Sequence, residues 1–234
     1  MVAVAPLDED GAWEIARMYV ARAWRGSGLA HRLLDAAEAH ARAAGARRAR
    51  LWSDTRFRPA HRFYEKRSYV RVGPLRVLGD LSHSLEFGYA KPLSGIAAET
   101  LGAAAAASAG RVLAALAPAP DWRKLAAEVA TGRRVLAVAW NEGVIAGSLE
   151  LALPEAGPAR LERPLLAADQ PGEKVGPVLF AAAERAARGL GVRLLTAAVP
   201  EGDWLAPFLL GTGWTLAGRV PGAFAFCWRS LELE

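Results

Sequence analysis

Six consecutive residues have the composition of an anion-binding loop: Arg25, Gly26, Ser27, Gly28, Leu29 and Ala30. They lie between an alternating segment, residues 13–20, and a helix expected from residue 27 or 28 to residue 44. The first turn of a helix has unpaired N–H groups and the positive end of the helix dipole, and glycines let the backbone approach a ligand closely. With the hydroxyl of Ser27 and the guanidinium of Arg25, this loop predicts a phosphate site.

Three interpretations of this loop compete. It is consistent with a plain glycine turn before a helix. A dinucleotide fingerprint would need a small residue where His31 stands and a carboxylate about 20 positions on, and Asp54 is too late for that role. A coenzyme A loop has the pattern Arg/Gln-x-x-Gly-x-Gly/Ala, which Arg25, Gly28 and Ala30 fit.

The segment downstream favours the third interpretation. Residues 60–69 read AHRFYEKRSY. With the strand and loop before it, this segment resembles the GNAT superfamily of N-acetyltransferases, whose second motif is Asn-x-x-Ala-x-x-Phe-Tyr-Glu-Lys-x-Gly-Phe. The resemblance covers about residues 2–92. Phe57 stands where asparagine is usual, Ser68 where glycine is and Tyr69 where phenylalanine is, and the first departure is expected to weaken a contact with the coenzyme.

The resemblance implies transfer of acetyl from acetyl-CoA to the amine of a small-molecule acceptor. The amides of the loop would surround the pyrophosphate, and strand-like backbone would pair with pantetheine. Tyr64 would protonate the leaving thiolate. Besides the six loop residues, the residues implied in coenzyme binding are Met18, Tyr19, Val20, Phe57 and Ala60.

A base that takes the proton of the amine is less well indicated. Glu14 is the best candidate because its strand leads to the loop, although it reads equally well as an ordinary strand-edge carboxylate. Glu86 is a second candidate. The four histidines, His31, His40, His61 and His83, show no metal-ligand spacing, so no metal is expected.

The fold class predicted is α/β, in the α+β sense, with a mixed central sheet in each of two tandem GNAT-like domains, residues 1–93 and 94–234. The strands expected are residues 2–7, 13–20, 48–53, 69–72, 84–90, 135–140, 144–152, 160–167, 193–199, 214–218 and 223–229. The helices expected are residues 27–44, 59–67, 100–116, 122–130 with Asp121 as N-cap, 174–190 and 204–210.

An internal repeat supports the tandem arrangement, because eight residues between positions 33 and 47 recur between positions 179 and 193 at a constant offset of 146. The second copy looks non-catalytic. At the loop positions it has Pro171, Glu173 and Lys174, and Leu209 falls where the first copy has Tyr64. The first copy lacks a strand, two helices and a further strand that usually precede this region, so either the chain is shortened or its second half, or a dimer mate, supplies the acceptor wall.

Composition sets the remaining expectations. Residues 1–93 hold 16 Lys/Arg and 10 Asp/Glu, and the remainder hold 13 and 14, so the first half attracts anions more strongly. No nucleic-acid motif or membrane span is recognisable. The single cysteine, Cys227, and the lack of a leader pattern favour the cytoplasm. A non-catalytic acyl-CoA-binding module is the alternative function, since the acceptor elements are missing.

Overall fold

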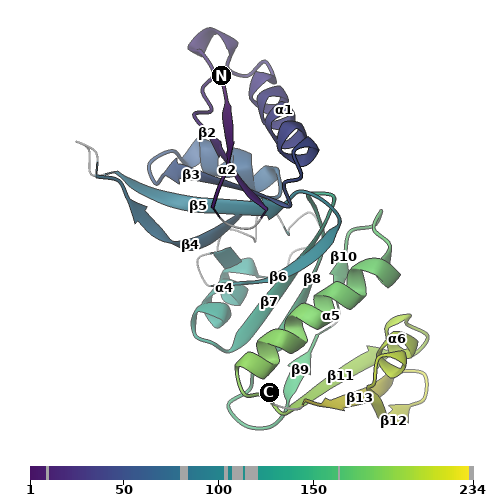
Figure 1. Ribbon diagram of the computed structural model, residues 1–234. Coiled ribbons are helices and arrows are strands. Elements are labelled where there is room, and N and C mark those ends of the chain that lie inside the picture. Colours follow the sequence, from purple (N-terminus) through teal and green to yellow (C-terminus); the bar gives the residue numbers. More distant parts are fainter. Residues whose placement is uncertain are drawn as a thin grey trace. The chain divides into compact units, whose positions relative to one another are not determined.

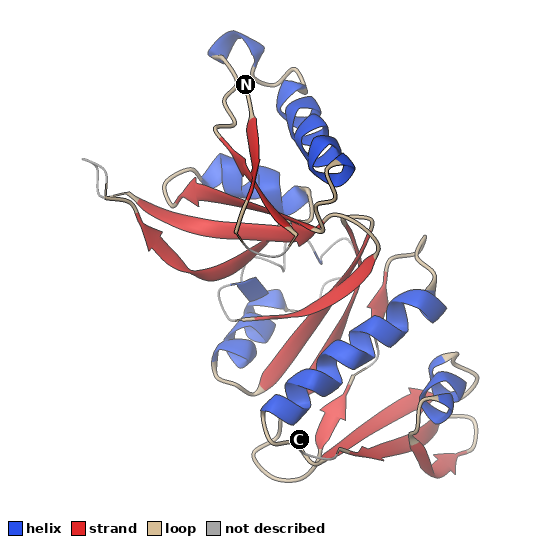
Figure 2. Ribbon diagram, in the orientation of Figure 1, coloured by secondary structure: helices blue, strands red, loops and turns tan. Residues whose placement is uncertain are grey.

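A computed structural model describes residues 1–8, 11–79, 84–102, 105–106, 113, 121–162 and 164–231 (Figures 1 and 2). The chain divides into two compact units. Unit 1 is Met1–Ala97 with Trp140–Ile145, and unit 2 is Ala98–Ala139 with Ala146–Glu234. Within the described residues, no helix has the length and apolar character needed to cross a membrane. His83 and most of the helix expected over residues 100–116 lie outside the described residues.

Unit 1 is built on a five-stranded sheet in the order β1-β2-β3-β5-β4. Its strands are β1 (Ala3–Pro6), β2 (Ala12–Ala16), β3 (Arg48–Asp54), β4 (Val70–Val77) and β5 (Leu85–Pro92). Only the β2–β3 pair is parallel, so the sheet is mixed, and the late antiparallel pair expected from the sequence is present as β4 and β5.

Two helices pack against this sheet, α1 (Leu29–Ala43) and α2 (Arg58–Lys66), with a 3-10 turn at Arg22–Trp24 before the first. Figure 1 shows α1 beside β1 and β2, and α2 behind β3. The buried positions Leu34, Ala37 and Ala41 follow helical spacing and join Leu51 and Tyr89 in one core cluster.

Unit 2 contains an eight-stranded sheet in the order β12-β13-β11-β9-β8-β7-β6, with β10 paired to β8. The strands are β6 (Ile96–Leu101), β7 (Arg134–Asn141), β8 (Val144–Ala152), β9 (Ala159–Leu161), β10 (Leu165–Leu166), β11 (Leu194–Pro200), β12 (Thr215–Val220) and β13 (Phe224–Ser230). The helices are α4 (Trp122–Ala130), α5 (Gly172–Gly189) and α6 (Leu205–Gly211). The Asp121 carboxylate accepts from the amides of Arg123 and Lys124, so the predicted N-cap is confirmed.

The two units share one topology. The path β8-β9-β11-β13-β12 repeats the order and the strand directions of β1-β2-β3-β5-β4. β3 and β11 begin and end at positions 146 residues apart, and α1 and α5 end at positions with the same separation. The internal repeat predicted from the sequence is therefore confirmed, and the fold is α/β with two mixed sheets in tandem.

Four predicted elements were wrong in extent, and one of them, the strand expected over residues 69–72, is longer and runs to Val77 as β4. The helix expected from residue 100 cannot begin there, because β6 runs to Leu101. The strand expected over residues 13–20 ends at Ala16, because Arg17 adopts a positive φ of 50° that breaks the extended chain. The strand expected over residues 160–167 divides into β9 and β10, and Pro164 between them has no N–H to donate to a ladder.

Candidate active site

The predicted phosphate loop is shaped by two glycines in the left-handed region. Gly26 has φ 82° and Gly28, the N-cap of α1, has φ 79°. The Ser27 hydroxyl donates to the Trp24 carbonyl at 2.7 Å, and Arg25 Nε donates to the Val20 carbonyl at 3.3 Å. These side-chain bonds hold the loop against the chain that enters it. The Ser27 hydroxyl therefore stabilises the conformation of the loop in this structure.

A run of backbone N–H groups has no hydrogen-bond partner in the described part of the chain. These amides belong to Gly26, Gly28, Leu29, Ala30 and His31. A Cβ placed on Gly26 or Gly28 would meet no atom within 4 Å, so open space lies beside the same amides. Unpaired donors at the positive end of α1, with room for a ligand, fit a pyrophosphate.

The chain before the loop leaves the sheet at a defined point. Parallel pairing of β2 with β3 ends at Glu14 and Arg50, although β3 continues to Asp54. Tyr19 exchanges backbone hydrogen bonds with Met1, accepting at 2.7 Å and donating at 2.9 Å. In an extended chain, successive residues direct their backbone N–H and C=O groups to opposite edges, so those of Met18 point away from Met1. In the described structure these groups of Met18 have no partner. Met18 thus offers the free edge that pairing with an extended ligand needs.

Tyr64 lies in the core of unit 1 with 8% of its surface exposed. Its ring contacts the rings of Phe63, Tyr69 and Tyr89 at centroid distances of 5.4, 6.0 and 6.0 Å. No hydrogen bond of its hydroxyl is present among the described residues. Burial, and secondarily the nearby Tyr89, raises the pKa of Tyr64 to about 12, so its hydroxyl stays protonated at neutral pH.

The start of α2 carries the departure at Phe57. This residue is the N-cap of α2, and 57% of it is exposed. Its side chain caps no amide, because a phenyl ring cannot accept the hydrogen bond that asparagine would. Ala60 packs against the core cluster. His31 on the first turn of α1 contacts Phe63 at 4.9 Å between centroids, which brings the N-terminus of α1 next to the helix that carries Tyr64.

The candidate bases differ in their surroundings. Trp13 and Ile15 pack on the core cluster that contains Tyr64, so Glu14, which alternates with them, belongs to the opposite face of the sheet. Glu86 accepts two hydrogen bonds from Arg76, at 2.5 and 3.0 Å, both at its Oε2 atom. The structure therefore does not bring Glu14 and Tyr64 together directly. Their side chains belong to opposite faces of the sheet, so an amine that reacts between them would have Glu14 on one side and Tyr64 on the other.

A buried polar cluster beside this site was not predicted. The Tyr69 hydroxyl donates to Glu38 Oε1 at 3.0 Å, and Lys91 Nζ lies 2.9 Å from the same oxygen. Tyr69, Glu38 and Lys91 are 0%, 2% and 4% exposed. The signal that could have found it is the repeat, in which Glu38 matches Glu184 on helix faces that are otherwise apolar.

Unit 2 has lost the corresponding loop. Its helix α5 starts at Gly172, whereas the position equivalent to Leu29 is residue 175, so the loop is wound into helix. The Trp204 ring also covers this end, because a Cβ on Gly176 would lie 2.9 Å from it. Leu209 accepts from the Trp214 amide at 3.1 Å, as Tyr64 does from Tyr69 at 3.1 Å, so Leu209 stands at the place of the tyrosine.

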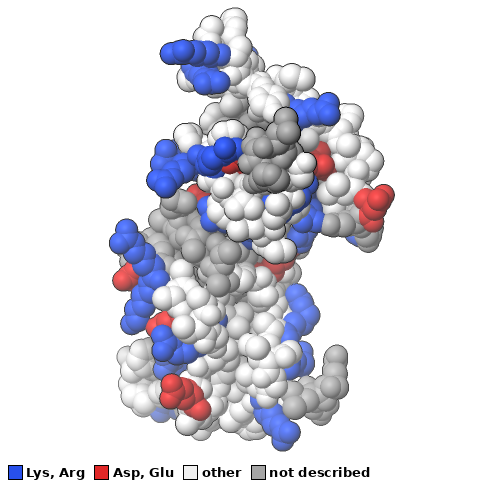
Figure 3. Space-filling model, turned by 90° about the vertical axis from the view of Figure 1, so that its left-hand side faces the viewer, with Lys and Arg blue, Asp and Glu red and all other residues white. Residues whose placement is uncertain are grey.

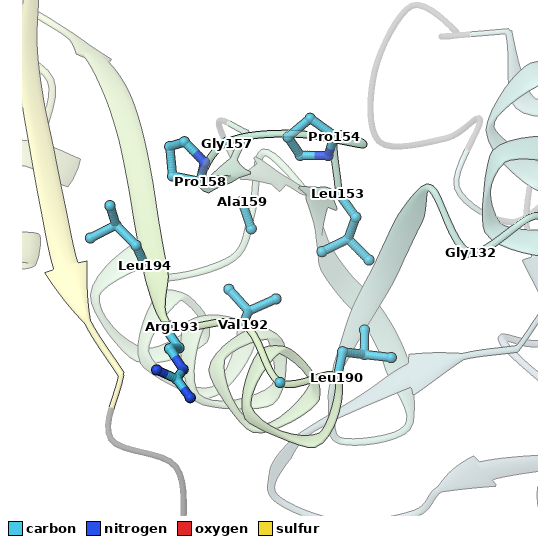
Figure 4. Close-up of a pocket in the computed structure, with 11 residues that line it drawn as sticks. Gly132, Leu153, Pro154, Gly157, Pro158, Ala159, Leu190, Val192, Arg193 and Leu194 are labelled. Atoms are coloured by element: carbon cyan, nitrogen blue, oxygen red, sulfur yellow. The ribbon is translucent and has the colours of Figure 1, made fainter.

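A cavity of about 710 Å³ in unit 2 is no counterpart of the loop (Figure 4). It lies at the C-terminal end of α5, near Leu190, and not at the end where α1 carries its free amides. Figure 4 shows Arg193 extending away from Leu153, Pro154 and Pro158, and the other side chains that line the cavity are apolar.

Charge and metal ligands add little to the site. On the face shown in Figure 3, Lys and Arg side chains form separate groups with acidic or uncharged residues between them. Over the residues that the structure describes, no three His, Cys, Asp or Glu side chains gather in a group that could hold a metal ion.

Comparison with known proteins agrees with the loop and α2. Residues 1–69, which include the loop and α2, match the model of the acetyltransferase (GNAT) family. No curated protein matches the chain.

Solved structures similar to the chain include three acetyltransferases. The PaiA N-acetyltransferase of Thermoplasma acidophilum, in complex with coenzyme A, is 16% identical over 58% of this chain and 99% of its own, with a TM-score of 0.45. A GNAT-family acetyltransferase of Streptococcus pneumoniae is 13% identical over 58% and 99%, with a TM-score of 0.47. An acetyltransferase of Thermus thermophilus is 23% identical over 59% and 99%, with a TM-score of 0.42.

Proposed function

We propose that residues 1–93 form an acetyl-CoA-dependent N-acetyltransferase domain that acts on the amine of a small molecule, and that residues 94–234 form a second, non-catalytic copy. The observation that carries this proposal is the group of unpaired amides at Gly26 and at residues 28–31, beside open space, inside a segment that matches the GNAT family. Acetyl-CoA supplies the acyl group and the thiolate leaving group.

Each chain element has a defined task in this proposal. The loop amides and the dipole of α1 hold the pyrophosphate, with Arg25 close by. The free backbone groups of Met18 orient the pantetheine as an added strand would, next to Tyr19 and Val20, and Phe57 and Ala60 flank it at the start of α2. Tyr64 holds a proton at its hydroxyl oxygen and delivers it to the thiolate, and Glu14 receives the proton of the amine.

Two features support Tyr64 as the acid. Tyr64 is buried and its hydroxyl has no protein partner in the described structure, which is costly unless a ligand or water completes it. The copy that lost the phosphate loop also lost this tyrosine, since Leu209 replaces it. Loss of both together is expected if the two serve one reaction.

Product formation from acetyl-CoA and a panel of primary amines tests this proposal. We expect turnover by the wild type and a fall in kcat of about 10²–10⁴-fold in Tyr64→Phe, which removes only the hydroxyl. Unchanged kcat in Tyr64→Phe would remove Tyr64 as the acid.

A non-catalytic acyl-CoA-binding module is the second candidate. The observation that favours it is the position of Glu14, the proposed base, which belongs to the face of the sheet opposite to Tyr64. Coenzyme binding by the wild type without turnover of any amine would support the module and contradict the enzyme.

A further inference from the structure

Tyr64 is held in place by its neighbours alone. In the described structure its hydroxyl makes no hydrogen bond, and its ring packs against three other aromatic rings, edge-on or tilted, within the apolar core cluster. A proton donor must be kept within about 0.5 Å of its productive position. The residues that fix those rings therefore decide where the Tyr64 hydroxyl lies.

Among these neighbours, Tyr69 contacts Tyr64 in two ways. Its amide donates to the Tyr64 carbonyl at 3.1 Å, and its ring lies 6.0 Å from the Tyr64 ring at an interplanar angle of 66°. Tyr69 follows the C-terminal turn of α2, so both contacts act where the helix ends. A shift of the Tyr69 ring would move the surface on which Tyr64 rests.

Tyr69 is in turn fixed at its far end. Its hydroxyl donates to Glu38 on α1, and Lys91 on β5 pairs with that carboxylate. The Lys91 ammonium also lies 4.9 Å from the centre of the Tyr69 ring and donates to the Arg67 carbonyl at 3.1 Å. The helix α1, through Glu38, thus holds the Tyr69 hydroxyl, and the strand β5, through Lys91, holds one face of the Tyr69 ring.

Comparison with unit 2 shows which parts of this cluster the two copies share. The helix glutamate and the strand cation are kept there as Glu184 and Arg229, 3.1 Å apart. Trp214 takes the place of Tyr69 and Leu209 the place of Tyr64. The ion pair is therefore present in both copies, whereas the phenol hydroxyl that binds the glutamate is present only beside Tyr64.

We propose that Tyr69 is a positioning residue for Tyr64: its hydroxyl, anchored on Glu38, fixes the ring against which the proton donor is placed. This inference rests on the proposed function, in which Tyr64 is the acid. It predicts that the Tyr69 hydroxyl affects the chemical step through Tyr64 and has little effect on the coenzyme.

A double-mutant cycle on kcat tests the proposal, using the full chain, acetyl-CoA and an amine that the wild type acetylates. We expect Tyr69→Phe to lower kcat about tenfold with the KM for acetyl-CoA unchanged within about twofold. In a Tyr64→Phe background the same change should alter kcat less than about twofold, because the group it positions is gone. Trp214→Phe, the equivalent substitution in unit 2, is the control for lost stability alone and should leave kcat unchanged.

The outcomes are distinct. An equal loss in both backgrounds, a change in KM alone, or no loss of kcat in Tyr69→Phe overturns the positioning role and leaves the acid role of Tyr64 intact. Normal kcat in Tyr64→Phe, or no turnover by the wild type, overturns the proposed function and this inference with it. If Tyr69→Phe does not fold, Tyr69→Trp, the residue of unit 2, carries the same comparison.

Discussion

Lys91 and Arg229 are equivalent residues that serve the same ion pair in the two copies. Lys91 lies opposite Ala49 in the β3–β5 ladder, and Arg229 lies opposite Leu195 in the β11–β13 ladder, with Ala49 and Leu195 separated by the repeat offset of 146. Each cation reaches a glutamate on the helix that packs on its sheet. The pair therefore ties helix to strand in this fold, and in unit 1 it is fully buried.

The buried pair gives the first prediction. Lys91→Met should destabilise the protein by about 3 kcal/mol, because it leaves the Glu38 carboxylate buried with only the more distant Arg42 and Arg67, at 3.4 and 3.9 Å. Adding Glu38→Gln should recover most of the loss, since glutamine is uncharged and still accepts from Tyr69. Urea unfolding of the three proteins measures both effects. A double variant less stable than Lys91→Met would contradict this account.

Alkaline pH gives the second prediction. The folded pKa of Tyr64 is about 12 and its ordinary value is 10.0, so its contribution is fully present below pH 10 and is lost as pH rises from about 10 to 12. A pKa difference of about 2 between the folded and unfolded protein corresponds to about 3 kcal/mol of unfolding free energy. The unfolding free energy of the wild type should fall more steeply in this window than that of Tyr64→Phe. Parallel curves would show that burial of this phenol is not the cause.

The turn at Ser68 gives the third prediction. Ser68 has φ 68°, which costs a non-glycine residue about 1 kcal/mol, while its hydroxyl accepts from the Ile145 amide at 3.3 Å. Ser68→Ala keeps the strain and loses the hydrogen bond, whereas Ser68→Gly loses both. Ser68→Gly should therefore be more stable than Ser68→Ala by about 1 kcal/mol in thermal unfolding. The reverse order would refute the assignment of strain to this residue.

The closed end of α5 gives the fourth prediction. Trp204→Ala should destabilise the protein by about 2–3 kcal/mol through lost packing on Gly172 and Gly176. It should not create a coenzyme site, because α5 still begins at Gly172. Calorimetric titration of acetyl-CoA into Trp204→Ala combined with Gly28→Glu checks this. Saturable binding there would show that unit 2 retains a site that the indole hides.

The sequence predicted the elements of unit 1 well because their signals are local. Gly28 before an amphipathic helix, Gly45 after it and Pro59 in the first turn of α2 all act within a few residues. The repeat offset then predicted the topology of the second sheet. The end of β2 was missed because the alternation of residues 13–20 continues past Arg17, and only the positive φ at Arg17 breaks the pairing.

Part of the candidate site could be predicted from the sequence, because its signals are local as well. The loop and Tyr64 belong to short motifs with fixed spacing. The cluster of Glu38, Tyr69 and Lys91 joins positions far apart in the chain, which only the packing of α1 on β5 brings together. The opposite faces of Glu14 and Tyr64 likewise depend on how strand alternation meets the helix layer.

Binding of acetyl-CoA by the Gly26–His31 amides is the central claim, and isothermal titration with matched variants tests it most directly. Gly28→Glu places a carboxylate in the open space beside these amides, Gly28→Ala reproduces the backbone strain without the charge, and Lys174→Glu places the same charge at the equivalent position of unit 2. We predict saturable binding to the wild type and Lys174→Glu, retained binding in Gly28→Ala, and affinity at least about a hundredfold weaker in Gly28→Glu, or about 2.7 kcal/mol. Equal affinity in Gly28→Glu and the wild type, or loss of binding in Lys174→Glu alone, would contradict it.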